Sequence, residues 1–132
     1  MTMPVWIEKR VVLAYHDMQL AEHGGSRGVR DEGLLESALA RPQNIAAYAS
    51  GAPTVRRLAA SYAFGIARNH PFVDGNKRTA LVVSIAFLAR NGIAFAASQE
   101  ETYLIFYDLA AGKITEDELA KWFEAHSAPA SK

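Results

Sequence analysis

The stretch from His70 to Arg78 concentrates the side chains of this chain that could do chemistry. His70 is suited to take a proton from an attacking hydroxyl, because the ordinary pKa of histidine lies near neutrality. Asp74 is a typical Mg²⁺ ligand, since that ion is usually held by one or two carboxylates together with phosphate oxygens. Lys77 and Arg78 add two cations where a polyphosphate would bind. This combination predicts phosphoryl or nucleotidyl transfer.

Two predicted helices flank this stretch. A helix that Thr54 can cap is expected to end near Asn69, because the residue before Pro71 disfavours the helical conformation. A second helix is predicted over about 77–90, where it closes on Asn91-Gly92. Its middle is apolar on all sides, which is typical of a buried central helix.

The start of the second helix is expected to bind anions. Its first N–H groups have no partner within the helix and carry about half a positive charge, so they attract phosphate. Gly75 would let the backbone approach a ligand closely, and Asn76 could cap the helix or contact an oxygen. Cations at a helix N-terminus are otherwise unfavourable by roughly 0.3–1 kcal/mol each. Lys77 and Arg78 therefore indicate an anionic partner.

The rest of the chain is also predicted to be mainly helical, because apolar residues recur at helical spacing between turn signals. The expected elements are a helix over 5–23 with Ile7, Val11, Val12, Tyr15 and Met18 on one face, a short helix from Asp31 to Pro42, an exposed loop over 43–53, helices opened by capping boxes at Ser98 and Thr115, and a frayed tail over 127–132. The fold class is all-α, a single compact bundle of about six helices around the helix at 77–90. Residues 1–126 form the predicted domain.

The amino-acid composition excludes or disfavours several classes of function. The chain has 132 residues, and its 14 Lys plus Arg balance its 14 Asp plus Glu. A net charge of zero disfavours direct nucleic-acid binding, because such domains tend to be strongly basic. The absence of cysteine excludes disulfides and thiolate metal sites. No apolar run is long enough to span a bilayer, so a cytoplasmic protein without a membrane partner is expected.

Single residues of the stretch also have simpler interpretations. Phe72 and Val73 are expected mainly to anchor the loop. His16-Asp17 could indicate a metal-dependent phosphohydrolase. A single His-Asp pair on an amphipathic helix is, however, more often an ordinary polar feature of the surface or the core. The functional interpretation of His70 to Arg78 depends on the coincidence of all its residues.

The run HPFVDGNKRTA resembles the motif of the Fic superfamily, HxFx[DE]GNxRxxR, and in particular its death-on-curing toxin branch. The matching residues are His70, Phe72, Asp74, Gly75, Asn76 and Arg78. Lys77 stands where glycine is usual and Leu81 where the second arginine is, and both departures are typical of the death-on-curing branch. The flanking Tyr15-His-Asp17, Gly24-Gly25 and Arg90-Asn-Gly92 are similar to that branch as well.

The resemblance implies a Fic-like helical fold and the toxin of a type II toxin–antitoxin system. Most of the superfamily transfers AMP to a protein hydroxyl, whereas this branch transfers the γ-phosphate of ATP to a threonine of elongation factor Tu and blocks translation. By position, the general base would be His70 and the Mg²⁺ ligand Asp74. The ATP phosphate ligands would be Gly75, Asn76, Lys77 and Arg78. The loop at 43–53 would dock the target segment.

The resemblance also implies how such an enzyme is controlled. Many Fic proteins carry an inhibitory [ST]xxxE[GN] helix, but no Ser or Thr of this chain is followed by Glu four residues later. A separate antitoxin of the prevent-host-death (Phd) type is therefore expected. Three alternatives stay open: a Fic-type adenylyltransferase, a catalytically inactive Fic-like binding module, and a ribonuclease toxin, which the zero net charge disfavours.

Overall fold

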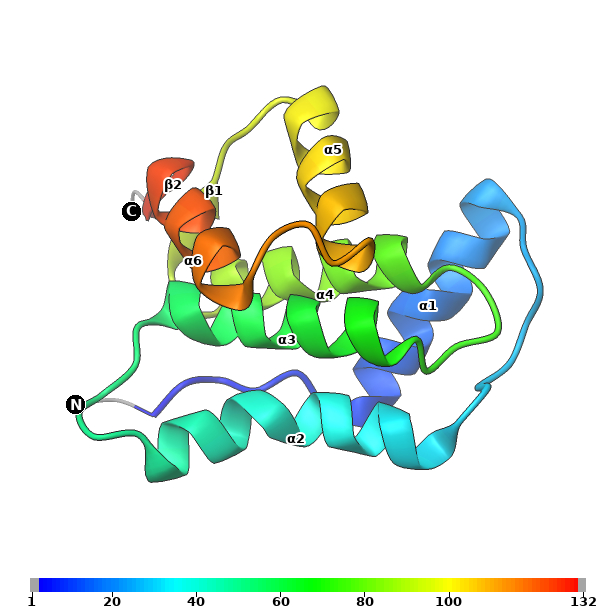
Figure 1. Ribbon diagram of the computed structural model, residues 1–132, viewed down its shortest axis with the longest axis horizontal. Coiled ribbons are helices and arrows are strands. Elements are labelled where there is room, and N and C mark those ends of the chain that lie inside the picture. The colour runs from blue at the N-terminus through cyan, green and yellow to red at the C-terminus, as the bar shows by residue number, and fades with distance from the viewer. Residues whose placement is uncertain (1–2, 131–132) are drawn as a thin grey trace.

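Six helices make up most of residues 3–130, the part of the chain that the computed structural model describes (Figure 1). The elements follow in the order α1 Lys9–His23, α2 Glu32–Tyr48, α3 Val55–Asn69, α4 Asn76–Arg90, β1 Ile93–Phe95, α5 Gln99–Ala110, α6 Glu116–Ala125 and β2 Ser127–Pro129. The predicted all-α bundle is confirmed.

Helix α3 lies at the centre, with α2 and α4 along its sides and α5 and α6 also packed on it (Figure 1). Small residues let these neighbours approach, and Ala59, Ala60 and Ala63 are completely buried. Tyr62 is buried too, and its hydroxyl accepts a hydrogen bond from the Ile7 N–H at 3.1 Å. Helix α4 packs between α3 and α1, which fits its apolar middle, although α3 is the more enclosed of the two.

The first helix begins later than the sequence predicted, at Lys9 instead of residue 5. The preceding residues are not helical, and the backbone N–H and C=O of Val5 both bond to the side chain of Asn91. The buried face of α1 is Val12, His16 and Leu20, whereas Met18 is 58% exposed. The expectation that Met18 faces the core was wrong. The face of α1 that packs on α4 includes His16, and Met18 does not lie on that face.

Pro42 does not stop the second helix, which was a wrong prediction. Helix α2 continues through it to Tyr48, so residues 43–48 of the expected loop are helical and only 49–54 connect α2 to α3. Pro42 is buried on the same face as Leu35, Ala38 and Leu39. This packing against α3 offsets the backbone hydrogen bond that proline cannot make.

The C-terminal residues are also more ordered than predicted. Residues 127–129, expected in a frayed tail, form β2 and pair antiparallel with β1, with Ala94 opposite Ala128. The Ala96 N–H bonds to the His126 carbonyl at 2.8 Å and extends the pairing. The last two residues of the predicted tail, 131–132, lie outside the described part.

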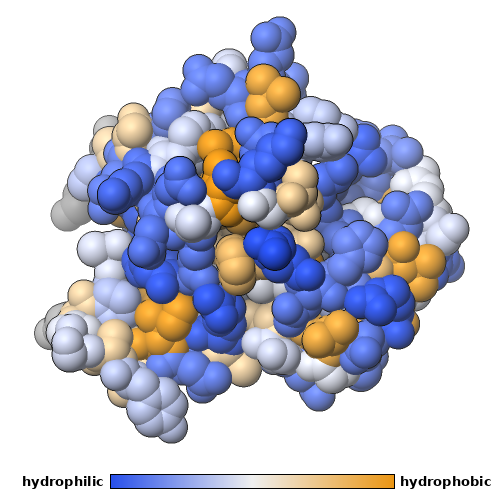
Figure 2. All heavy atoms as spheres, viewed as in Figure 1, coloured by the Kyte–Doolittle hydropathy of each residue, from blue (hydrophilic) through white to orange (hydrophobic). Residues whose placement is uncertain are grey.

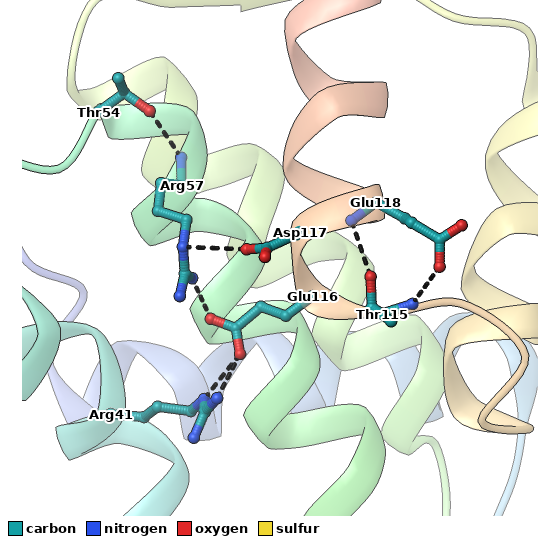
Figure 3. A network of polar contacts seen from close by, with 7 residues as sticks. All are labelled: Arg41, Thr54, Arg57, Thr115, Glu116, Asp117 and Glu118. Atoms are coloured by element: carbon teal, nitrogen blue, oxygen red, sulfur yellow. Dashed lines mark hydrogen bonds and ion pairs between the residues drawn. The ribbon is translucent and has the colours of Figure 1, made fainter.

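The buried carboxylate of Glu116 forms ion pairs that connect three helices (Figure 3). Glu116, whose side chain is 8% exposed, begins α6 and binds Arg41 of α2 and Arg57 of α3. The cap beside it was predicted correctly: Thr115 and Glu118 form the reciprocal capping box. At α5 only half of the predicted box forms, because the Ser98 hydroxyl accepts from the Glu101 N–H while the Glu101 carboxylate pairs with His126 at 3.0 Å.

Replacing Glu116 with glutamine is expected to lower the free energy of unfolding by about 1–3 kcal/mol, because both arginines lose a charged acceptor. Urea titration at neutral pH measures this difference. Asp117→Asn is the matched control, since that carboxylate is 79% exposed and lies 3.6 Å from Arg57. The control is expected to change stability by less than about 0.5 kcal/mol. Equal losses in the two variants would contradict the assignment.

The surface drawn in Figure 2 is mainly hydrophilic, and its hydrophobic residues occur in small separate groups. Within residues 3–130, no helix combines the length and the apolar character that crossing a membrane requires.

Candidate functional site

The stretch from His70 to Arg78 forms the connection between α3 and α4 together with the first three residues of α4 (Figure 1). Helix α3 ends at Asn69, as predicted, and His70 follows it in the left-handed conformation, with φ 53° and ψ 53°. Left-handed backbone is uncommon outside glycine and costs roughly 1–2 kcal/mol. His70 therefore leaves the helix axis sharply, and its exposed side chain is free to face a ligand.

Phe72 anchors the connection in the core, as predicted. Its side chain is completely buried and stacks on the ring of His16, with 3.8 Å between the centroids. Val73 contributes in another way: its side chain is 48% exposed, and its backbone N–H bonds to the Gly28 carbonyl at 3.0 Å. The difference follows from the extended backbone, which forms a bridge between Phe72 and Val29 and points successive side chains in opposite directions.

The Asn76 side chain stabilises the conformation of the loop through hydrogen bonds to the loop backbone. It is buried, accepts from the Phe72 N–H at 2.9 Å and donates to the Phe72 carbonyl at 3.0 Å. Its amide is therefore occupied by the protein backbone. What Asn76 can offer to an anion is its own main-chain N–H at the start of α4.

Asp74 presents a carboxylate that stays ionised. Hydrogen bonds from the backbone N–H groups of Ser26, at 3.2 Å, and Gly75, at 2.9 Å, hold the pKa of Asp74 below its ordinary value, and the charge of Arg78 acts in the same direction. Gly25 makes this contact possible, because a Cβ there would lie 2.9 Å from the Asp74 carboxylate.

The N-terminus of α4 carries no side-chain cap. Gly75 precedes it with φ 77°, a conformation that favours glycine, and a glycine at the N-cap has no side chain that could bond to the first N–H groups of the helix. Helices α2, α3, α5 and α6 are capped by a side chain, whereas α1, like α4, is not. The uncapped N–H groups of α4, with the positive end of its dipole, have the properties that an anion-binding site requires.

One cavity of about 370 Å³ collects all the predicted site residues. Its lining consists of His70, Asp74, Gly75, Asn76, Lys77, Arg78, Tyr103 and Ala110. Beside it lies a larger and mainly apolar groove of about 740 Å³, which shares Arg78 and Tyr103 with the cavity. The smaller cavity holds the titratable groups, so we assign the chemistry to it.

A divalent cation fits this cavity only together with a phosphate. In residues 3–130, no three side chains of the metal-binding types lie close enough together to hold a metal ion. Asp74 supplies one exposed, ionised carboxylate. Mg²⁺ is commonly bound by such a carboxylate together with phosphate oxygens, and phosphates at the α4 N-terminus would supply them.

The loop expected to dock a target lies away from this cavity. Residues 49–54 connect to the N-terminus of α3, whereas His70 follows its C-terminus. Since α3 has 15 residues, the two sites are separated by roughly 20 Å along the helix axis. Helix α5 instead borders the cavity through Tyr103 and Ala110, and the α1–α2 connection contacts Asp74 through the Ser26 N–H.

Several residues around the cavity were missed in the sequence. His16 was interpreted as ordinary polarity, yet its Nε2 lies 2.8 Å from the Asp74 carbonyl. Its position four residues from both Val12 and Leu20, on the apolar face of α1, was the available signal. Tyr107 places its ring 4.9 Å from the Lys77 ammonium, and Arg30 bonds to the carbonyls of Asn69 and His70. Nothing local in the sequence marks these two.

Comparison with known proteins agrees with the motif. The model of a family described as "Fic/DOC family" matches residues 6–88, well over half of the chain. "Toxin Doc" of Mycolicibacterium smegmatis is 46% identical over 74 residues, which cover 56% of this chain and 57% of the relative. The alignment therefore spans less than two thirds of that relative's length.

A second relative aligns over a larger part of its length. "Protein kinase doc" of Escherichia phage P1 is 35% identical over 109 residues, which cover 83% of this chain and 82% of the relative.

Proposed function

The chain belongs to the Fic/DOC family, and from this premise we propose that it is the toxin of a type II toxin–antitoxin system and acts as a protein kinase. The proposed reaction transfers the γ-phosphate of ATP to a threonine hydroxyl of elongation factor Tu. The observation that carries the proposal is the single cavity in which a histidine, an ionised carboxylate, two cations and an uncapped helix N-terminus meet.

His70 is proposed as the general base. Its imidazole accepts the proton of the threonine hydroxyl while the hydroxyl oxygen attacks the γ-phosphorus. The bond from the γ-phosphorus to the bridging oxygen then breaks, and ADP leaves with the electron pair of that bond. The exposed position of His70 at the end of α3 leaves room for a protein segment to bring the hydroxyl to it.

The phosphates are proposed to bind at the start of α4. The backbone N–H of Asn76 and the side chains of Lys77 and Arg78 would hold the oxygens, on which negative charge is spread during transfer. Gly75, whose own N–H is bonded to the Asp74 carboxylate, would let the backbone approach the phosphates closely. The Tyr107 ring restrains the Lys77 ammonium at 4.9 Å by a cation–π contact. Asp74 would hold Mg²⁺, which neutralises phosphate charge when bound.

A labelling experiment with elongation factor Tu separates this proposal from its rivals. Incubation with Mg-ATP is expected to transfer label from the γ-phosphate to a threonine and no label from the α-phosphate. Transfer of α-label with covalent AMP would identify an adenylyltransferase, which Leu81 in place of a second arginine disfavours. If neither label is transferred, the chain is not a kinase of elongation factor Tu, and an inactive binding module is then the better interpretation.

A separate Phd-like antitoxin is proposed as the inhibitor, because the chain has no inhibitory motif of its own. "Toxin Doc" is the name of one relative, and toxins of such systems are controlled by a partner protein. We propose the cytoplasm, where elongation factor Tu acts, as the location of the protein.

A further inference from the structure

Two side chains from the N-terminal part of the chain bind the main chain of the proposed catalytic residues. Arg30 donates from Nε to the carbonyl of His70 at 2.7 Å. The Nε2 of His16 lies 2.8 Å from the carbonyl of Asp74. Because a carbonyl only accepts, this Nε2 carries the proton of the His16 ring.

Arg30 stabilises the strained backbone turn at His70. His70 is the only non-glycine residue with positive φ in residues 3–130. The guanidinium bonds to the carbonyls of Asn69, at 3.0 Å, and His70, and the Arg30 N–H bonds to the Pro71 carbonyl at 2.7 Å. A cation is also favoured at the C-terminus of α3 by the helix dipole. Arg30 therefore opposes relaxation of His70 out of the left-handed conformation.

His16 fixes the other end of the loop. It is 3% exposed, and its ring is stacked on Phe72 at an interplanar angle of 11°. The ring cannot turn away without opening the core, so it holds the Asp74 carbonyl at a constant place. With that carbonyl held, the Asp74 carboxylate stays within reach of the Ser26 N–H.

We propose that Arg30 and His16 are positioning residues for the phosphate transfer, an inference that rests on the proposed function. Neither is among the residues that line the 370 Å³ cavity, so neither is placed to touch the substrate. Each acts through a backbone carbonyl: Arg30 sets the direction of the His70 imidazole, and His16 sets the position of the Asp74 carboxylate. A loop held at both ends keeps the base and the metal-binding group at a constant separation.

The kinetic test uses Arg30→Met, because Arg30 is exposed and its replacement should leave the core intact. Loss of its charged hydrogen bonds is expected to lower kcat about tenfold and to change KM for ATP by less than about twofold. Arg30→Lys keeps a positively charged donor group and is expected to recover part of the loss. His16→Gln, which keeps an N–H donor, is likewise expected to be more active than His16→Leu.

Arg27→Met is the matched control, since Arg27 lies on the same connection and makes no hydrogen bond or ion pair to another residue in the described range of 3–130. It is expected to transfer phosphate at the rate of the unmodified chain. An Arg30→Met variant that also keeps this rate would overturn the proposal.

Amide exchange tests positioning without relying on activity. The Val73 N–H bonds to the Gly28 carbonyl at 3.0 Å and reports whether the loop is closed. Its exchange is expected to be about tenfold faster in Arg30→Met and in His16→Leu than in Arg27→Met. If the unmodified chain transfers no phosphate, the proposed function fails, and this exchange still decides whether the two residues hold the loop. Equal exchange in all three variants overturns the inference.

Discussion

Replacing His70 with asparagine is expected to lower phosphate transfer by roughly 10²–10⁴-fold, the usual contribution of a general base. Asparagine tolerates the left-handed backbone that His70 adopts, so the variant removes the imidazole and keeps the turn. The quantity to measure is kcat for transfer of γ-label to elongation factor Tu. KM for ATP is expected to change little, because the phosphate ligands belong to α4.

A second variant separates the base from the backbone at this position. His70→Gly permits the same φ at no steric cost, and it leaves a gap where the ring was. Added imidazole is expected to restore part of its activity, whereas it should not affect the unmodified protein. The general-base role would be rejected if His70→Asn kept activity within about tenfold of the unmodified chain.

Replacing Asp74 with asparagine is expected to lower transfer by roughly 10²–10³-fold, because the proposed Mg²⁺ site loses its only protein carboxylate. Raising the Mg²⁺ concentration should not restore the rate. Asp74→Glu is the matched control, since the family pattern accepts either acid at this position, and it is expected to keep much more activity. Equal losses in both variants would argue against a metal role.

The lowered pKa of Asp74 gives the same substitution a pH signature. The folded state binds a proton at this carboxyl less readily than the unfolded state, so the stabilising contribution is present above the ordinary value of 3.8 and is lost as pH falls through the lower, folded value. The stability difference between the unmodified chain and Asp74→Asn should therefore shrink below pH 3.8. A difference that grew on acidification would contradict this assignment.

Features that depend on neighbours in the chain could be predicted from the sequence. The ends of α3, the caps at Thr54 and Thr115 and the order of groups from His70 to Arg78 are local, because each involves residues within a few positions of one another. The motif residues lie near the start of α4 because they directly precede or begin this helix in the sequence. The types and spacing of these residues are therefore enough to locate the candidate site.

Features that depend on packing could not be predicted in this way. Pro42 stays within α2 because its face is buried against α3, and residues 127–129 form a strand because β1 is beside them. A local rule for proline or for a chain end cannot include such partners. The loop predicted over 43–53 was wrong for residues 43–48 for the same reason, and the docking role expected for it stays a prediction.

The sequence by itself determined which residues are proposed to carry the chemistry of this protein, since their types and spacing are local properties of one short stretch. Only the tertiary structure decided how that stretch is held. Arg30 and His70 are 40 positions apart, and His16 and Asp74 are 58 apart. Contacts at such separations form only when α1 and the connection after it pack against the loop, because hydrogen-bond geometry is fixed by the fold and not by the order of residues.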